Sequence, residues 1–161
     1  MGSYSPDNNH AELLNIHSNA WTRLDPYPFV NSYISEVPII HVDGSFYVFG
    51  GYSGSEPDKT IGRLDTVTRQ WDKAGELIRG RHLHNAIYNG EFFIVVGGFS
   101  SSGTLGTEFC SLTKNNQMTC TSHAPNLYHY YGYPELYLIQ TDNDCDNGTV
   151  DSQDYSALTL R

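Results

Sequence analysis

The sequence has few of the features that mark nucleic-acid-binding, membrane-spanning or zinc-binding proteins. Its nine Lys and Arg residues are outnumbered by eighteen Asp and Glu residues, and a net charge of −9 argues against binding to phosphates or to anionic membranes. No apolar run approaches the roughly 20 residues of a membrane span. The three cysteines lack the spacing of zinc ligands. We therefore expect a folded acidic chain with no nucleic-acid partner, no membrane insertion and no metal.

The most informative feature that is present is a glycine pair after an apolar, strand-like segment. The pair Gly50-Gly51 is at the end of the segment "SFYVFGG". A second pair, Gly97-Gly98, is at the end of "EFFIVVGG", 47 residues later. Glycine within a strand is costly in backbone entropy, so its recurrence indicates a structural requirement. Recurrence at this spacing is typical of a repeat protein.

Each repeat holds two hairpins. Asp43-Gly44 and Asn89-Gly90 separate apolar segments, and both dipeptides favour a type I′ hairpin turn, whose two central residues need positive φ. Two alternating segments follow each glycine pair, in "TIGRLDTVTRQW" and "TEFCSLTKNNQM", and "HAELLNIHSNAW" is an earlier copy. We predict an all-β chain of four-stranded antiparallel units, strands a to d, with the glycines ending strand b. The period matches a propeller blade.

These residues resemble the Kelch repeat: Gly-Gly after an apolar strand, a Trp about 20 residues later, and Arg-x-x-His at Arg81 and His84. The resemblance extends to about Ile139, with Met118 in place of the second tryptophan and Val37 in place of one histidine. It implies a β-propeller segment of the galactose-oxidase-like superfamily. It also implies structural roles, in strand ends and blade packing, for Gly50, Gly51, Gly97, Gly98, Trp21 and Trp71.

The chain holds about three blades, whereas closed propellers usually have about 4–8. We interpret it as a partial propeller and a fragment of a longer protein; two copies forming one six-bladed ring would also fit. The C-terminal segment is interpreted as a polar tail, and a diverged closing strand is the alternative. The expected divisions are a partial propeller at 1–141, with a half blade at 10–24, blades at 35–75 and 84–122 and a first strand at 133–141, and a tail at 142–161.

The resemblance implies a binding module for a protein, a peptide or a glycan, with no catalysis and no cofactor of its own. The alternatives are part of a propeller enzyme of the galactose-oxidase or sugar-acid epimerase kind, or an extracellular structural protein. No spacing marks tyrosines or histidines as metal ligands. Kelch-like propellers bind partners through their b–c and d–a loops, where tyrosine and arginine are typical anchors. The candidates here are Tyr52, Ser53, Arg79, Arg81, His82, Phe99, Tyr128, Tyr130 and Tyr131.

Cysteine positions bear on the compartment. Cys110 and Cys120 lie in one predicted c–d hairpin, and a loop at 113–117 would place them opposite each other, within disulfide range. The alternative is two buried thiols in a reducing cell. Asn147 begins a glycosylation sequon. Together these features favour an extracellular over a cytoplasmic location. No other feature of the sequence indicates the compartment.

Overall fold

A computed structural model describes residues 11–29, 36–101, 103–122, 135–140 and 155–160. All regular secondary structure in this part of the chain is β-strand, which confirms the predicted all-β fold. Among these residues, no helix has the length and apolar character needed to cross a membrane.

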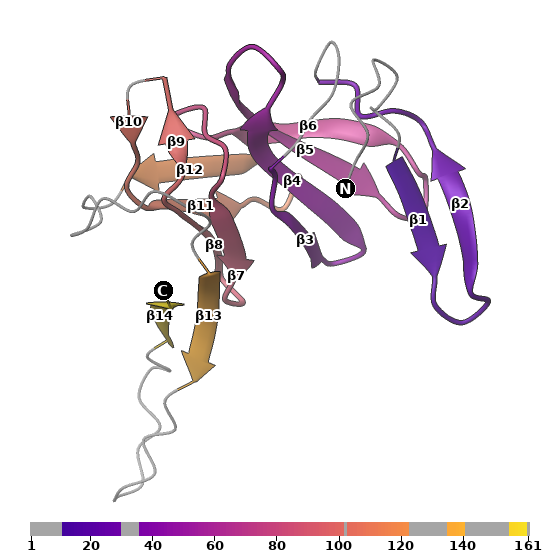
Figure 1. Ribbon diagram of the computed structural model, residues 1–161. Helices are drawn as coiled ribbons and strands as arrows, with labels where there is room; N and C mark the ends of the chain where they lie inside the picture. Colours follow the sequence, from indigo (N-terminus) through magenta and orange to yellow (C-terminus); the bar gives the residue numbers. More distant parts are fainter. Residues whose placement is uncertain (1–10, 30–35, 102, 123–134, 141–154, 161) are drawn as a thin grey trace, which may run out of the picture.

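Two four-stranded antiparallel blades form the centre of the structure (Figure 1). In both blades each strand pairs with the next one of the a-to-d pattern. The first blade contains β3 (Ile39–Val42), β4 (Ser45–Tyr52), β5 (Pro57–Asp65) and β6 (Trp71–Glu76). The second contains β7 (Asn85–Tyr88), β8 (Phe92–Val96), β11 (Glu108–Leu112) and β12 (Met118–Ser122), and a short hairpin of β9 (Phe99–Ser100) and β10 (Gly103–Thr104) interrupts it between β8 and β11.

The two a–b turns differ from each other. Asp43 and Gly44 both have positive φ, 47° and 72°, as the predicted type I′ turn requires. In the second blade the Asn89 N–H donates to the Phe92 carbonyl oxygen, so the bend is centred one residue later than predicted. Gly90 alone has positive φ there, and the Asn89 side-chain oxygen accepts hydrogen bonds from the backbone N–H groups of Glu91 and Phe92.

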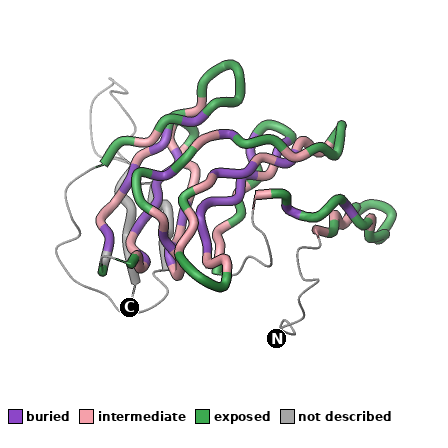
Figure 2. The backbone as a smooth tube through the Cα atoms, turned by 90° about the horizontal axis from the view of Figure 1, so that it is seen from above, coloured by how far each residue is buried: buried purple, intermediate pink, exposed green. Residues whose placement is uncertain are grey.

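The blades pack face to face around one hydrophobic core. Tyr47 and Phe49 of β4 place their rings 5.2 and 5.3 Å from the ring of Phe93 on β8, and Phe93 is fully buried. β12 also pairs in parallel with β6 beside Gly75, which joins the two blades into one eight-stranded sheet. Figure 2 shows that buried residues concentrate in these two blades, whereas the N-terminal hairpin is mostly exposed.

The glycine pairs lie near the end of strand b, inside β4 in the first blade and directly after β8 in the second, where another backbone crosses closely. A Cβ at Gly50, with φ of 56°, would lie 2.8 Å from the Arg81 carbonyl oxygen. At Gly98, with φ of 85°, it would lie 2.6 Å from the His82 carbonyl oxygen. Any side chain would clash with the crossing segment, so glycine is required by both conformation and space.

Two further hairpins flank the blades. β1 (Ala11–Asn15) pairs only with β2 (Ala20–Leu24), and β13 (Glu135–Gln140) pairs only with β14 (Tyr155–Leu160) among the described residues. β14 lies within the segment interpreted as a tail. In the structure, residues 155–160 form a strand that pairs antiparallel with β13 over six residue pairs.

The two tryptophans have different environments. Trp71 packs edge-on against Tyr27, with ring centroids 5.1 Å apart, and its Nε1–H donates to the Asp25 carbonyl oxygen. This agrees with the expected packing role. Trp21 is 65% exposed, so the packing role expected for it is absent from the described part of the chain.

Candidate partner-binding surface

The b–c and d–a loops meet at one end of the two blades, because antiparallel strands place alternate connections at opposite ends. The d–a connection, residues 77–84, crosses this end. Its Arg81 carbonyl oxygen accepts a hydrogen bond from the Gly51 N–H at 2.8 Å. His82 and Phe99 exchange two backbone hydrogen bonds, of 2.9 and 3.1 Å. The crossing segment is therefore held by backbone contacts to both blades.

Three aromatic side chains gather on this crossing and form what we call the aromatic row: Tyr52, His82 and Phe99. The His82 ring centroid lies 5.1 Å from that of Tyr52 and 6.1 Å from that of Phe99. All three residues are half-buried. The Glu36 carboxylate lies 3.9 Å from His82 Nε2, and its side chain is 34% exposed. The row thus combines apolar ring surface with a carboxylate at its margin.

The comparison with protein families finds a match in the first blade, which contributes Tyr52 to this surface. A model of the Kelch motif matches residues 35–78, a range that includes all four strands of the first blade. Residues 35–78 of the chain are thus similar to a Kelch motif. No curated protein sequence matches it.

The remaining loop candidates are placed as follows. Arg79 is exposed on the d–a connection. Ser53 belongs to the b–c loop, where its hydroxyl donates to the Glu56 carbonyl oxygen at 3.1 Å. The other candidates lie outside the described residues: Tyr128, Tyr130, Tyr131 and the sequon residue Asn147.

Arg81 requires a correction, because it is not a surface anchor. Its side chain is 2% exposed and its guanidinium is paired with the buried carboxylate of Glu108. The same guanidinium donates to the carbonyl oxygens of Gly97 and Gly106, both at 2.9 Å. The second Glu108 oxygen accepts the Ile78 N–H at 2.8 Å. Arg81 therefore joins the d–a connection to the second blade, and a partner cannot reach it.

His84 is buried between the two blades, and it is 6% exposed. Neither imidazole nitrogen has a hydrogen-bond partner among the described residues. Burial lowers the pKa of His84 to about 3, and the nearby Arg81 charge adds to the shift. The imidazole is thus neutral at physiological pH, which fits the structural rather than catalytic role expected for it.

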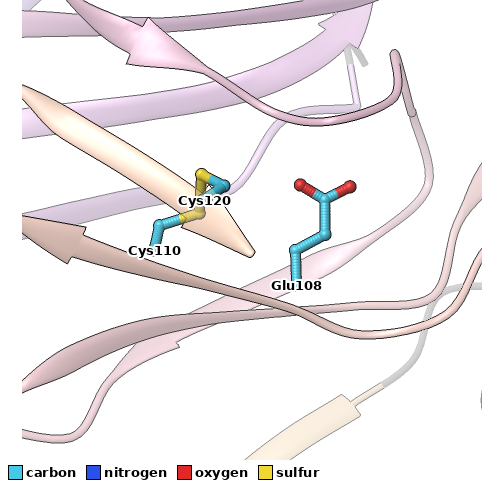
Figure 3. A group of neighbouring side chains, drawn as sticks. All are labelled: Glu108, Cys110 and Cys120. Atoms are coloured by element: carbon cyan, nitrogen blue, oxygen red, sulfur yellow. A yellow bond between two sulfur atoms is a disulfide. The ribbon is translucent and has the colours of Figure 1, made fainter. Parts of the chain in front are cut away.

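Cys110 and Cys120 are directly opposite each other on β11 and β12, as predicted. A disulfide bond joins them, and their Cα atoms are 3.9 Å apart. Figure 3 shows the Glu108 carboxylate near the two sulfur atoms. This group is not suited to a metal ion, because the sulfurs are bonded to each other and the carboxylate is engaged by Arg81.

Sequence reasoning missed the two carboxylates of this region, Glu36 and Glu108. Glu36 precedes the first blade with no recognisable motif around it. Glu108 opens a strand whose next residues are Phe109 and Cys110. A glutamate is seldom fully buried without a paired cation. The position of Glu108 at the start of an apolar strand was therefore the one available signal for its pairing with Arg81.

Proposed function

We propose that this Kelch chain is a non-catalytic binding module, part of a longer protein, that engages a protein or peptide through the aromatic row. The Kelch motif is typical of protein-interaction modules. The observation that supports the proposal best is the convergence of Tyr52, His82 and Phe99, from three separate connections, on one rigid end of the blade pair. Aromatic side chains supply large contact area at low entropic cost, and loops on rigid scaffolds commonly bind partners.

The charges around the row favour a partner that presents an apolar or aromatic group next to a basic one. Glu36 offers a half-exposed carboxylate beside His82. The formal charge of −9 would also attract a basic partner over longer range. We therefore propose a peptide segment with a Lys or Arg adjacent to an aromatic residue, and place Arg79 at the rim, where charges contribute less.

Binding without catalysis is supported by the positions of the buried ionisable groups. Arg81, Glu108 and His84 are the buried Arg, Glu and His side chains among the described residues, and each is at most 6% exposed. Side chains this deeply buried are not accessible to a substrate in the folded chain. The Cys110–Cys120 disulfide supports an extracellular or otherwise oxidising compartment. A glycan, which aromatic rings could also contact, and a second copy of the chain are the other partners we propose to test.

The experiment is selection of a random peptide library on the wild-type chain, followed by measurement of each peptide's affinity. The test variant combines Tyr52→Ala and Phe99→Ala. The matched control is Val67→Ala, which shortens an exposed apolar residue at the opposite end of the blade. We expect the double variant to weaken binding at least tenfold and the control to leave it unchanged.

Two results would overturn the proposed surface. One is a set of selected peptides whose affinity is the same for the wild-type chain and the double variant. The other is a set of peptides whose binding is weakened as much by Val67→Ala as by the double variant. A melting temperature within a few degrees of wild type is required of both variants, so that loss of folding is not mistaken for loss of binding.

A further inference from the structure

The turn between β7 and β8 contains an asparagine followed by glycine, Asn89-Gly90. Asn89 is half-buried and Gly90 is exposed. Every other asparagine in the described part of the chain precedes a residue that carries a side chain. The backbone nitrogen after an asparagine can close a succinimide ring with the side-chain carbonyl carbon, and the bulk of the residue that supplies this nitrogen limits their approach. Asn89 is therefore the described asparagine that is most open to attack by the main chain.

Gly90 offers an accessible backbone nitrogen as the nucleophile. Its φ is 99°, and a Cβ built on it would meet nothing within 4 Å. Its N–H makes no hydrogen bond to the described residues, whereas its carbonyl oxygen accepts the Tyr88 hydroxyl at 2.8 Å. The turn is therefore held by the Gly90 carbonyl group while the Gly90 N–H stays open to water, which can remove its proton.

The side-chain oxygen of Asn89 is held by two hydrogen-bond donors. The Glu91 N–H donates to Oδ1 at 3.0 Å and the Phe92 N–H donates to it at 2.7 Å. When a nucleophile adds to the neighbouring carbon, Cγ, negative charge develops on this oxygen. Backbone N–H groups at such distances stabilise that charge, as they do in an oxyanion hole. The turn thus polarises the amide that the Gly90 nitrogen would attack.

Two other turns of the chain each have one of these features without the other. In the turn after β1, Asn15 Oδ1 accepts the N–H groups two and three residues later, both at 3.0 Å, but the next residue is Ile16. Its side chain is branched at Cβ and crowds its own backbone nitrogen. In the first blade, Gly44 follows Asp43, whose carboxylate has no ammonia to lose. Among the described turns, the one at Asn89 combines the donors, the amide and the glycine.

We propose that Asn89 is a site of spontaneous deamidation and that the folded turn promotes the reaction. The Gly90 nitrogen, after losing its proton to water, adds to Asn89 Cγ and forms a new C–N bond. The bond from Cγ to Nδ2 then breaks, and ammonia leaves with a proton taken from water. One water molecule opens the resulting succinimide. Addition of this water at Cγ yields aspartate, and addition at the Asn89 main-chain carbonyl carbon yields an isoaspartyl link through the side chain.

The two products affect the second blade differently. Aspartate keeps an oxygen that accepts the Glu91 and Phe92 N–H groups, so the turn persists with one more negative charge. The isoaspartyl product lengthens the main chain and displaces the Asn89 N–H from the Phe92 carbonyl oxygen, which it contacts at 3.1 Å. β8 begins at Phe92 and carries the fully buried Phe93. Isoaspartyl formation should therefore loosen the packing of the second blade.

Incubation of the whole chain at pH 7.5 in heavy-oxygen water, with and without denaturing guanidinium chloride, tests the site. Peptide mass spectrometry then locates and quantifies the incorporated oxygen. We expect Asn89 to convert several-fold faster in the folded chain than in the denatured one, because the two donors are in place only in the folded turn. Asn15 should stay intact in the same folded sample. A folded rate at Asn89 that equals or falls below the denatured rate overturns the inference.

Three variants separate the donors from the nucleophile. Glu91→Pro removes one donor and should lower the folded rate to that of the denatured chain, whereas Glu91→Gln keeps the N–H and should keep the wild-type rate. Ile16→Gly gives Asn15 the missing nucleophile, so Asn15 should become a second site that converts faster folded than denatured. This variant tests the donors even if Glu91→Pro does not fold. Equal rates for folded Glu91→Pro and Glu91→Gln chains overturn the role of the donors, as does an Asn15 that gains nothing from folding.

Discussion

The buried imidazole of His84 should make the stability of the protein fall steeply in mild acid. In the unfolded chain a histidine has a pKa near 6.5, whereas burial between the blades lowers the pKa of His84 to about 3. Between these two values the unfolded chain binds a proton that the folded chain excludes. The free energy of unfolding is therefore at its full value above pH 6.5 and decreases as the pH falls toward 3.

The size of the effect follows from the two pKa values. Each pH unit within the window removes about 1.4 kcal/mol, so lowering the pH from 7.5 to 5 should cost about 2 kcal/mol through His84 alone. Two paired carboxylates do not titrate in this range. Glu76 has its pKa lowered to about 2 by Lys59 and Lys73, and Asp65 has its pKa lowered by backbone hydrogen bonds, so both lose their protons well below pH 5.

Urea unfolding at pH 7.5, 6.5, 5.75 and 5 measures this dependence. His84→Gln removes the titrating group and should flatten the curve by about 2 kcal/mol over the range, whatever its effect on absolute stability. His41→Gln, at an exposed position of β3, is the matched control and should keep the wild-type slope. If His84→Gln and wild type show equal slopes, the reasoning is refuted. Nitrogen chemical shifts that show a protonated His84 in the folded chain at pH 5 would refute it independently.

Two further predictions concern the contacts between the d–a connection and the second blade. Arg81→Met should lower the free energy of unfolding by about 3–5 kcal/mol, because Glu108 would be left buried without its cation. Arg79→Met should change it by less than about 0.5 kcal/mol, and equal melting temperatures for the two variants would contradict the assignment. Reduction with dithiothreitol should lower the free energy of unfolding by about 2–3 kcal/mol, since the Cys110–Cys120 bond closes a short loop. The Cys120→Ser variant should show no response to the reductant, and a wild-type chain equally unresponsive would mean that the bond is absent.

The repeat unit and its strands could be predicted from the sequence because they depend on nearby residues. Turn dipeptides such as Asp43-Gly44 determine where a hairpin bends, and alternation of apolar residues identifies the strands that they join. The opposition of Cys110 and Cys120 follows from the length of a single loop. The glycine pairs were recognised as structural because two copies at one spacing exclude chance, and Gly50 and Gly98 are indeed crossed by backbone.

Burial was decided by segments distant in the chain, and local sequence does not report it. Arg81 and His82 are adjacent in the same connection, yet Arg81 is buried against Glu108 while His82 joins Tyr52 and Phe99. Whether an arginine is an anchor or an internal ion pair depends on a carboxylate that the second blade brings to it. The aromatic row likewise exists only because three connections meet at one end of the blades.

The same reason explains the exposed Trp21 and the paired β14. Trp21 and Trp71 follow similar turns, and their sequence surroundings predict one role for both. Trp71 is covered because Tyr27 reaches it from the preceding segment, whereas no described residue does the same for Trp21. β14 was hidden because its partner β13 lies across a long polar segment, so no turn signal joined the two. Sequence determined the strands and hairpins through local backbone chemistry; tertiary packing alone decided which side chains are enclosed and which edges are left open.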